Sequence, residues 1–310
     1  MNENLYDVIS SKGEATKPQA SVSEKKPFDK VTWAEQKQIE REQAFNLIDT
    51  TASDVVLDGN KFKQYLDVLS KFDKYSLGNT LLIMAQNPNA TKLADFEHWK
   101  ENKAIIKKGE KGICILEPGE EYKREDGTLA VSYNVKKLFD ITQTTATQKA
   151  PPTVKLDDRI ILKALLNNSP VPINISENLR DNVGALYKHD TKEILVRKGM
   201  DGSDIVRSIA QEMAHAYLAT SLDRDANYNR SENSFNAYAV SYVICKRNGI
   251  DTNNYDFTDI SELFSGLDTQ TIREELSGIR TVANDISNNM ADVLNSTTKQ
   301  HNKNKSEQSR

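Results

Sequence analysis

Apolar residues recur at helical spacing through the first half of the chain. From Lys61 to Gln86 they return every three or four residues, as at Phe62, Tyr65 and Leu66, which predicts two consecutive amphipathic helices. The run Asn87-Pro88-Asn89 ends this pattern, because proline and asparagine favour turns. We expect a short helix after it, carrying Phe96 and Trp99.

Short apolar runs then replace the helical pattern and indicate strands. Residues 104–106 and 113–116 flank a turn rich in lysine and glycine at 107–112, which predicts a β-hairpin. Asp126-Gly127 predicts a second hairpin turn, followed by strands near 129–131 and 135–141. The first half is therefore expected to be α+β, with helices leading into a small antiparallel sheet.

A polar stretch rich in Thr, Gln and Pro, residues 142–153, is typical of a linker. Beyond it we expect a helix near Asp157, a hairpin formed by 184–187 and 193–196, and helices at about 203–220, 231–248 and 268–294. The predicted organisation is as follows: a disordered leader at 1–30, a first domain at 31–145, a linker at 146–156, a second domain at 157–295 and a disordered tail at 296–310.

Composition restricts the possible functions. The net charge of -4 argues against bulk electrostatic binding of nucleic acid, so that any such binding needs a local basic patch. The two cysteines, Cys114 and Cys245, lie far apart, which excludes a cysteine-rich zinc module and favours a reducing compartment. We find no apolar signal segment and no run long enough to cross a membrane, and we expect a cytoplasmic protein without membrane partners.

One local basic patch is present. Between residues 100 and 111 there are five lysines and two glutamates, close to Trp99. Single-stranded DNA is bound by cations along its phosphates and by flat rings on which bases stack. The same pattern also fits a solvated turn beside a core tryptophan, and both interpretations stay open on the residues alone.

Several ordered motifs in this region resemble the N-terminal domain of ArdC-type antirestriction proteins. They are Tyr75 to Asn79, Leu82 to Thr91, Trp99, Ile106 to Ile113 and Phe139 to Thr144. The resemblance covers about 85 residues and implies single-stranded DNA binding, in a family carried by plasmids, conjugative elements and phages. On matching positions it implies these DNA-binding candidates: Tyr75, Asn79, Trp99, Lys107, Lys108 and Lys111.

The second half carries a variant of a zinc-protease motif. In H-E-x-x-H, two histidines on one helical face bind zinc and the glutamate is the general base. Here the motif reads Gln211-Glu212-Met213-Ala214-His215, in a region that resembles the metallopeptidase-like C-terminal domain of ArdC- and LtrC-like proteins. The resemblance implies a zincin-like, mostly helical domain with a short β-hairpin, in which Glu212 would be the catalytic base and His215 a metal ligand.

The motif departs from this family at its ligands. Gln211 replaces the first histidine, and glutamine is a poor ligand for zinc. Tyr238, with Asn236 two residues before it, stands where the family has a glutamate as third ligand. His189 lies in a predicted hairpin turn, and nothing in the sequence places it beside His215. We therefore expect Glu212 and His215 to be vestigial in a pseudoenzyme without a cofactor, with zinc left as an open alternative.

Two classes of function follow. The first is a single-stranded DNA-binding protein of a mobile genetic element, which acts in antirestriction or protects DNA during conjugation, with restriction or conjugation proteins as further partners. The alternative is a zinc-dependent metallopeptidase or a protein-binding adaptor that uses the zincin-like domain.

Overall fold

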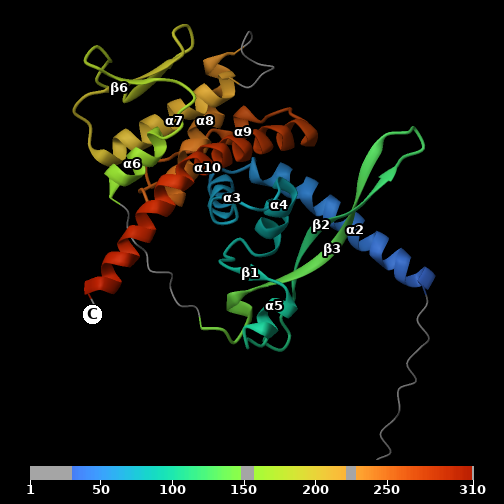
Figure 1. The fold of residues 1–310 in the computed structure, drawn as a ribbon. Coiled ribbons are helices and arrows are strands. Elements are labelled where there is room, and N and C mark those ends of the chain that lie inside the picture. Colours follow the sequence, from blue (N-terminus) through green and yellow to red (C-terminus); the bar gives the residue numbers. More distant parts are fainter. Residues whose placement is uncertain (1–29, 148–156, 221–227, 309–310) are drawn as a thin grey trace, which may run out of the picture. The chain divides into compact units, whose positions relative to one another are not determined.

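The computed structural model describes residues 30–147, 157–220 and 228–308, and Figure 1 shows the order of their elements. Apart from six strands, the described residues are mainly helical, which agrees with the α+β class predicted from the sequence. Its helices are α2 (Lys30–Val55), α3 (Gly59–Lys71), α4 (Leu77–Gln86), α5 (Phe96–Glu101), the 3-10 turn η1 (Ile141–Gln143), α6 (Asp158–Leu166), α7 (Gly202–Thr220), α8 (Arg230–Arg247), α9 (Ile260–Leu263) and α10 (Thr269–Gln308).

A first sheet has the antiparallel order β1-β3-β2, formed by β1 (Leu93–Ala94), β2 (Ile113–Lys123) and β3 (Leu129–Asp140). The predicted Asp-Gly turn joins β2 to β3. Gly127 has a φ of 85°, and the Asp126 side chain accepts a hydrogen bond from the backbone N–H of Thr128. This hairpin is therefore confirmed, with both strands longer than expected.

The hairpin predicted around residues 107–112 is wrong. Ile113 pairs with Leu138 of β3, and Ile106 forms only an isolated bridge with Thr144. Residues of both apolar runs form strand-type pairs, but their partners lie 25 residues further along the chain for Ile113 and 38 for Ile106. The lysine-rich segment between them is consequently a loop that lies against η1.

The second sheet has the order β4-β6-β5, formed by β4 (Ile173–Ser176), β5 (Ala185–Lys188) and β6 (Glu193–Arg197). β5 and β6 are the predicted antiparallel hairpin. β4 was not predicted, and it adds to β6 in parallel. Its four residues are half-buried or exposed, with Ile175 among the exposed apolar residues, so β4 lacks the alternation of buried and exposed positions by which a strand is recognised.

One hydrophobic core joins the helices of both halves within residues 39–310. On α3, Phe62 packs against Phe257 with ring centroids 5.1 Å apart. The Tyr242 hydroxyl on α8 donates to Oδ1 of Asp67 on α3 at 2.7 Å. The domain boundaries at residues 145 and 157 stay a prediction, because a shared core does not locate them.

The predicted leader and linker fall largely outside the described residues, whereas most of the predicted tail falls within them. The leader predicted at 1–30 lies outside the described residues except for Lys30, where α2 begins, and most of the predicted linker lies outside them as well. α10 extends to Gln308, so a helix covers most of the segment that we predicted to be a disordered tail. Over the described ranges, none of the helices combines the length and the apolar character that a bilayer crossing requires.

Arg247 connects three helices of the core. Its guanidinium donates to the backbone oxygens of Leu69 and Ala283 and to the side chains of Asn284 and Ser287, at 2.8 to 3.2 Å. Burial lowers the pKa of this guanidinium to about 10, but it stays charged at neutral pH. The end of α3 and the middle of α10 are thereby held against the end of α8.

We expect Arg247→Met to lower the free energy of unfolding by about 2–4 kcal/mol, because it removes all four hydrogen bonds of the guanidinium, including its bond to the buried backbone oxygen of Leu69. The neighbouring, partly exposed pair of Lys246 and Asp67 supplies a control, since Lys246→Met should cost less than about 1 kcal/mol. Urea unfolding followed by circular dichroism measures both. Equal losses would show that Arg247 does not hold the three helices together.

Candidate functional site

Two side-chain amides on α4 hold β2. Asn79 donates to the backbone oxygen of Leu116 and accepts from its N–H, both at 2.8 Å. Gln86 makes the same pair of bonds with Cys114, at 2.9 and 2.8 Å. Residues seven apart lie on one face of a helix, so these amides bind alternate residues of the strand. Asn79, a candidate for DNA binding, thus has both the nitrogen and the oxygen of its amide bonded to β2.

Tyr75 and Trp99 also have structural contacts. Tyr75 is partly buried, packs edge-on against Phe72, and accepts a hydrogen bond from Arg280 at its backbone oxygen. Burial raises the pKa of its hydroxyl. Trp99 is only 2% exposed and donates from Nε1 to the backbone oxygen of Phe139 at 2.9 Å. Trp99 therefore offers no ring face to a base in this structure.

The buried carboxylate of Asp140 organises the end of β3. Oδ1 accepts the backbone N–H groups of Thr91 and Lys92, and Oδ2 accepts the N–H and the hydroxyl of Thr142, at 2.6 to 2.9 Å. Burial alone would raise the pKa of Asp140, but these hydrogen bonds outweigh it and hold the pKa below its usual value. Asp140 thereby joins the loop after α4 to η1.

The Gln143 side chain connects Asp140 to the lysine loop, which we define as residues 107–112. Its Oε1 accepts the N–H of Asp140, and its Nε2 donates to Oε2 of Glu110 and to the backbone oxygen of Lys111, each at 2.9 Å. Lys107 adds two further bonds between the loop and η1. Its backbone N–H donates to the backbone oxygen of Gln143, and its Nζ donates to the backbone oxygen of Thr142. The backbone of the lysine loop is therefore fixed on both sides.

Two lysine side chains of the lysine loop are exposed to solvent. Lys108 and Lys111 are exposed, and within the part of the chain that the structure describes neither takes part in an ion pair. A groove of about 780 Å³ lies beside Lys111, which lines it together with Lys137, Thr142 and Gln143 among others. We call it the lysine groove. Lys137, which sequence reasoning missed, adds a cation from β3, and Glu110 is the acidic residue in the lining.

The candidate residues of the second half are engaged with one another. Glu212 on α7 is 4% exposed and makes two bonds of 2.7 Å to the guanidinium of Arg230 on α8. Its Oε2 also accepts the N–H of Tyr187 on β5 at 2.7 Å. Sequence reasoning missed Arg230, which gives the buried carboxylate its counter-charge.

His215 lies one turn further along α7 and is also buried. Its Nδ1 lies 2.6 Å from the Tyr228 hydroxyl, and the His189 ring stacks on Tyr228 with centroids 5.0 Å apart. The structure thus brings His189 close to His215 through Tyr228, which the sequence did not indicate. Burial, assisted by the charge of Arg230, lowers the pKa of His215 to about 3, so its imidazole is neutral at pH 7.

These residues do not fit a zincin metal site. Both carboxylate oxygens of Glu212 accept hydrogen bonds from the Arg230 guanidinium, and Gln211 offers only a neutral amide as a ligand. Tyr238 packs against Tyr255 and accepts the N–H of Asp256, and Asn236 donates to Glu275. Among the described residues, no group of three or more His, Cys, Asp or Glu side chains could hold a metal ion.

Comparison with known proteins adds an independent finding. Residues 54–153 match the model of a family described as the N-terminal domain of anti-restriction factor ArdC. Residues 54–153 are thus similar to the N-terminal domain of ArdC, and we refer to this segment below as the ArdC N-terminal domain. This domain contains Tyr75, Asn79, Trp99 and the lysine loop, whereas Glu212 and His215 lie beyond the matched residues.

Solved structures of an ArdC protein are also similar to the chain. Crystal structures of antirestriction ArdC from plasmid R388, one metal-free and one Mn(II)-bound, are 16% identical in sequence, with a TM-score of 0.49. The likeness covers 70% of this chain and 86% and 85% of those chains. A search of curated proteins gave no match.

In the ArdC N-terminal domain, we expect Asp140→Asn to lower the free energy of unfolding at pH 7 by about 1–3 kcal/mol, because an amide cannot accept all the donors. The pKa of Asp140 is depressed on folding, so its stabilisation is present above the unfolded pKa of about 3.9 and is lost as the pH falls further. Unfolding measured from pH 7 to pH 3 should show the two proteins converging below pH 4. A constant difference across that range would contradict this role.

In the second half, we expect Arg230→Met to lower the free energy of unfolding by about 2–3 kcal/mol, because it leaves the buried Glu212 carboxylate without its counter-charge. The Arg230 side chain is 38% exposed, which keeps the loss below that of a fully buried pair. Adding Glu212→Gln to this variant should restore part of the stability, since no charge is then buried. A double-mutant cycle by urea unfolding measures the coupling, and additive losses would show that the two side chains do not stabilise each other.

Proposed function

We propose that the ArdC N-terminal domain binds single-stranded DNA at the lysine loop and the lysine groove. The observation that carries this proposal is a backbone fixed by Gln143 while the ammonium groups of Lys108 and Lys111 stay exposed. A pre-ordered loop loses little conformational freedom when a strand binds. Cations along a groove are the part of a single-strand site that tracks phosphates.

The motif residues then divide into two roles. Asp140, Gln143 and Asn79 place the loop and the strands, whereas the lysines, including Lys137, meet the phosphates. Trp99 supports the fold from within the core. This division accounts for the presence of all these motifs in one domain without requiring each residue to touch DNA.

We further propose that this binding serves antirestriction by a mobile genetic element, which protects entering DNA. The support is the family match of residues 54–153. Restriction or conjugation proteins are the partners such a role would involve. The second half contributes packing to this function, since Glu212 and His215 are engaged with Arg230 and Tyr228.

The test is a variant that changes only the free cations. We expect Lys108→Gln with Lys111→Gln to weaken binding to a single-stranded oligonucleotide and to reduce the slope of log affinity against log salt by about 1.4, which is the loss of two phosphate contacts. Fluorescence anisotropy at several salt concentrations measures both quantities.

The matched control is Lys71→Gln with Lys74→Gln, which removes the same charge from exposed positions at the end of α3. It should leave the affinity nearly unchanged. An equal effect of the two double variants would show that only net charge matters and that the lysine loop is not the site. Matched duplex DNA, run in parallel, establishes whether single strands are preferred.

A further inference from the structure

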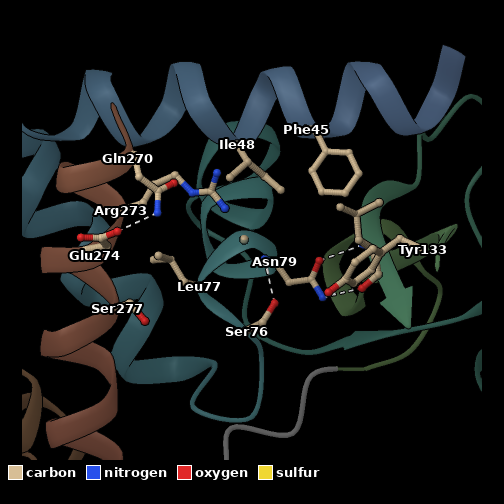
Figure 2. Close-up of a pocket in the computed structure, with 12 residues that line it drawn as sticks. Phe45, Ile48, Ser76, Leu77, Asn79, Tyr133, Gln270, Arg273, Glu274 and Ser277 are labelled. Carbon is tan, nitrogen blue, oxygen red and sulfur yellow. Dashed lines mark hydrogen bonds between the residues drawn. The ribbon is translucent and has the colours of Figure 1, made fainter. Parts of the chain in front are cut away.

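A second concave site lies at the N-terminal end of α4, whereas the lysine groove lies at its C-terminal end. It is a pocket of about 350 Å³ formed by α2, α4, β2, β3 and α10, and we call it the α10 pocket (Figure 2). Asn79 lines it, whereas Gln86 lines the lysine groove. These two residues are seven apart on one helix face, so the two sites are roughly 10 Å apart along α4.

One wall of the α10 pocket is aromatic. Phe45 of α2 and Tyr133 of β3 are 40% and 37% exposed, and their rings meet edge to face with centroids 5.8 Å apart. Exposed rings in a concavity are the surface on which nucleobases stack. Leu77 and Ile48 supply apolar lining beside them, and Gly78 lets α2 approach, because a Cβ there would lie 3.1 Å from Ile48.

The facing wall is polar and comes from α10. Figure 2 shows Gln270, Arg273, Glu274 and Ser277 opposite the two rings. Gln270 donates to Glu274 at 2.8 Å. These groups offer both donors and acceptors to the edge of a flat ligand.

The charges of this wall disfavour a phosphate. Arg273 is paired with Asp49 at 2.9 Å, which leaves the Glu274 carboxylate as the unbalanced charge of the lining. A carboxylate repels phosphate and accepts hydrogen bonds from amino groups. The α10 pocket therefore suits an uncharged flat group with an amino edge, and the lysine groove suits the phosphates.

We propose that the α10 pocket binds one nucleobase with an exocyclic amino group, contributed by the strand whose phosphates lie along the lysine groove. This inference rests on the proposed function for the source of the base. The base stacks on the rings of Phe45 and Tyr133 and meets Glu274 with its amino group. One base held in this way fixes the register of a strand that the lysines bind without sequence preference.

The probe is 2′-deoxyadenosine, which carries a base and no phosphate, titrated against the full chain and followed by saturation-transfer NMR. We expect saturable binding by the wild type. Tyr133→Ala should weaken it about fivefold or more, the loss of one stacking contact. Ser277→Trp, which fills the pocket and leaves both rings in place, should abolish it.

Two controls separate this site from the lysine groove. Tyr122→Ala removes another exposed tyrosine of the same hairpin outside the pocket, and it should bind the nucleoside as the wild type does. Lys108→Gln with Lys111→Gln should also keep nucleoside binding while it loses affinity for the strand.

The outcomes distinguish the two proposals. Absence of saturable nucleoside binding, or equal binding by wild type, Tyr133→Ala and Ser277→Trp, overturns the α10 pocket even if strand binding depends on the lysines. Nucleoside binding that is weakened by Tyr133→Ala and abolished by Ser277→Trp, together with weaker strand binding by both variants, supports it. A nucleoside site in a protein that binds no strand overturns both the proposed function and the strand as source of the base.

Discussion

The position of the candidate interface depends on one buried carboxylate. Asp140 collects the N–H groups of Thr91 and Lys92 and both donors of Thr142. A buried charge is tolerated only when hydrogen bonds replace its lost hydration, so the loop after α4 and the end of β3 must meet at this point. Gln143 follows within the same turn and holds Glu110 and Lys111. The position of the lysine loop therefore depends on the Asp140 carboxylate, which is buried.

The second half also contains a buried carboxylate, and there a guanidinium rather than backbone N–H groups alone compensates its charge. Glu212 is buried and negative, and Arg230 supplies two donors from the start of the next helix. Tyr187 adds a backbone N–H from the sheet, so α7, α8 and β5 converge on this carboxylate. The residues that resemble a metal-binding motif are used here to hold helices together.

Local patterns in the sequence predicted what depends on neighbouring residues. The helices around Phe62 and Leu81 and the Asp-Gly hairpin follow from spacing and turn chemistry, and they are present. The pairing of Ile106 with Thr144 could not be predicted, because nothing local distinguishes a near partner from one 38 residues away. The hairpin that we placed at the lysines failed for this reason.

The same division applies to the candidate site. The lysines were visible as a local excess of charge, and the alternative of a core position for Trp99 was visible in its apolar character. Asp140, Gln143 and Arg230 act on segments far along the chain, so their roles needed the structure. Asn79 and Gln86 did carry a signal, since two amides seven apart share a helix face.

The pairing of these two amides with β2 has a consequence for association. A strand at the rim of a sheet usually presents free N–H and C=O groups, which recruit strands from other molecules. Asn79 and Gln86 occupy those groups at Leu116 and Cys114, so this stretch of rim is closed to a foreign strand. Self-association by strand addition is blocked there, while the surface that carries the lysines stays open.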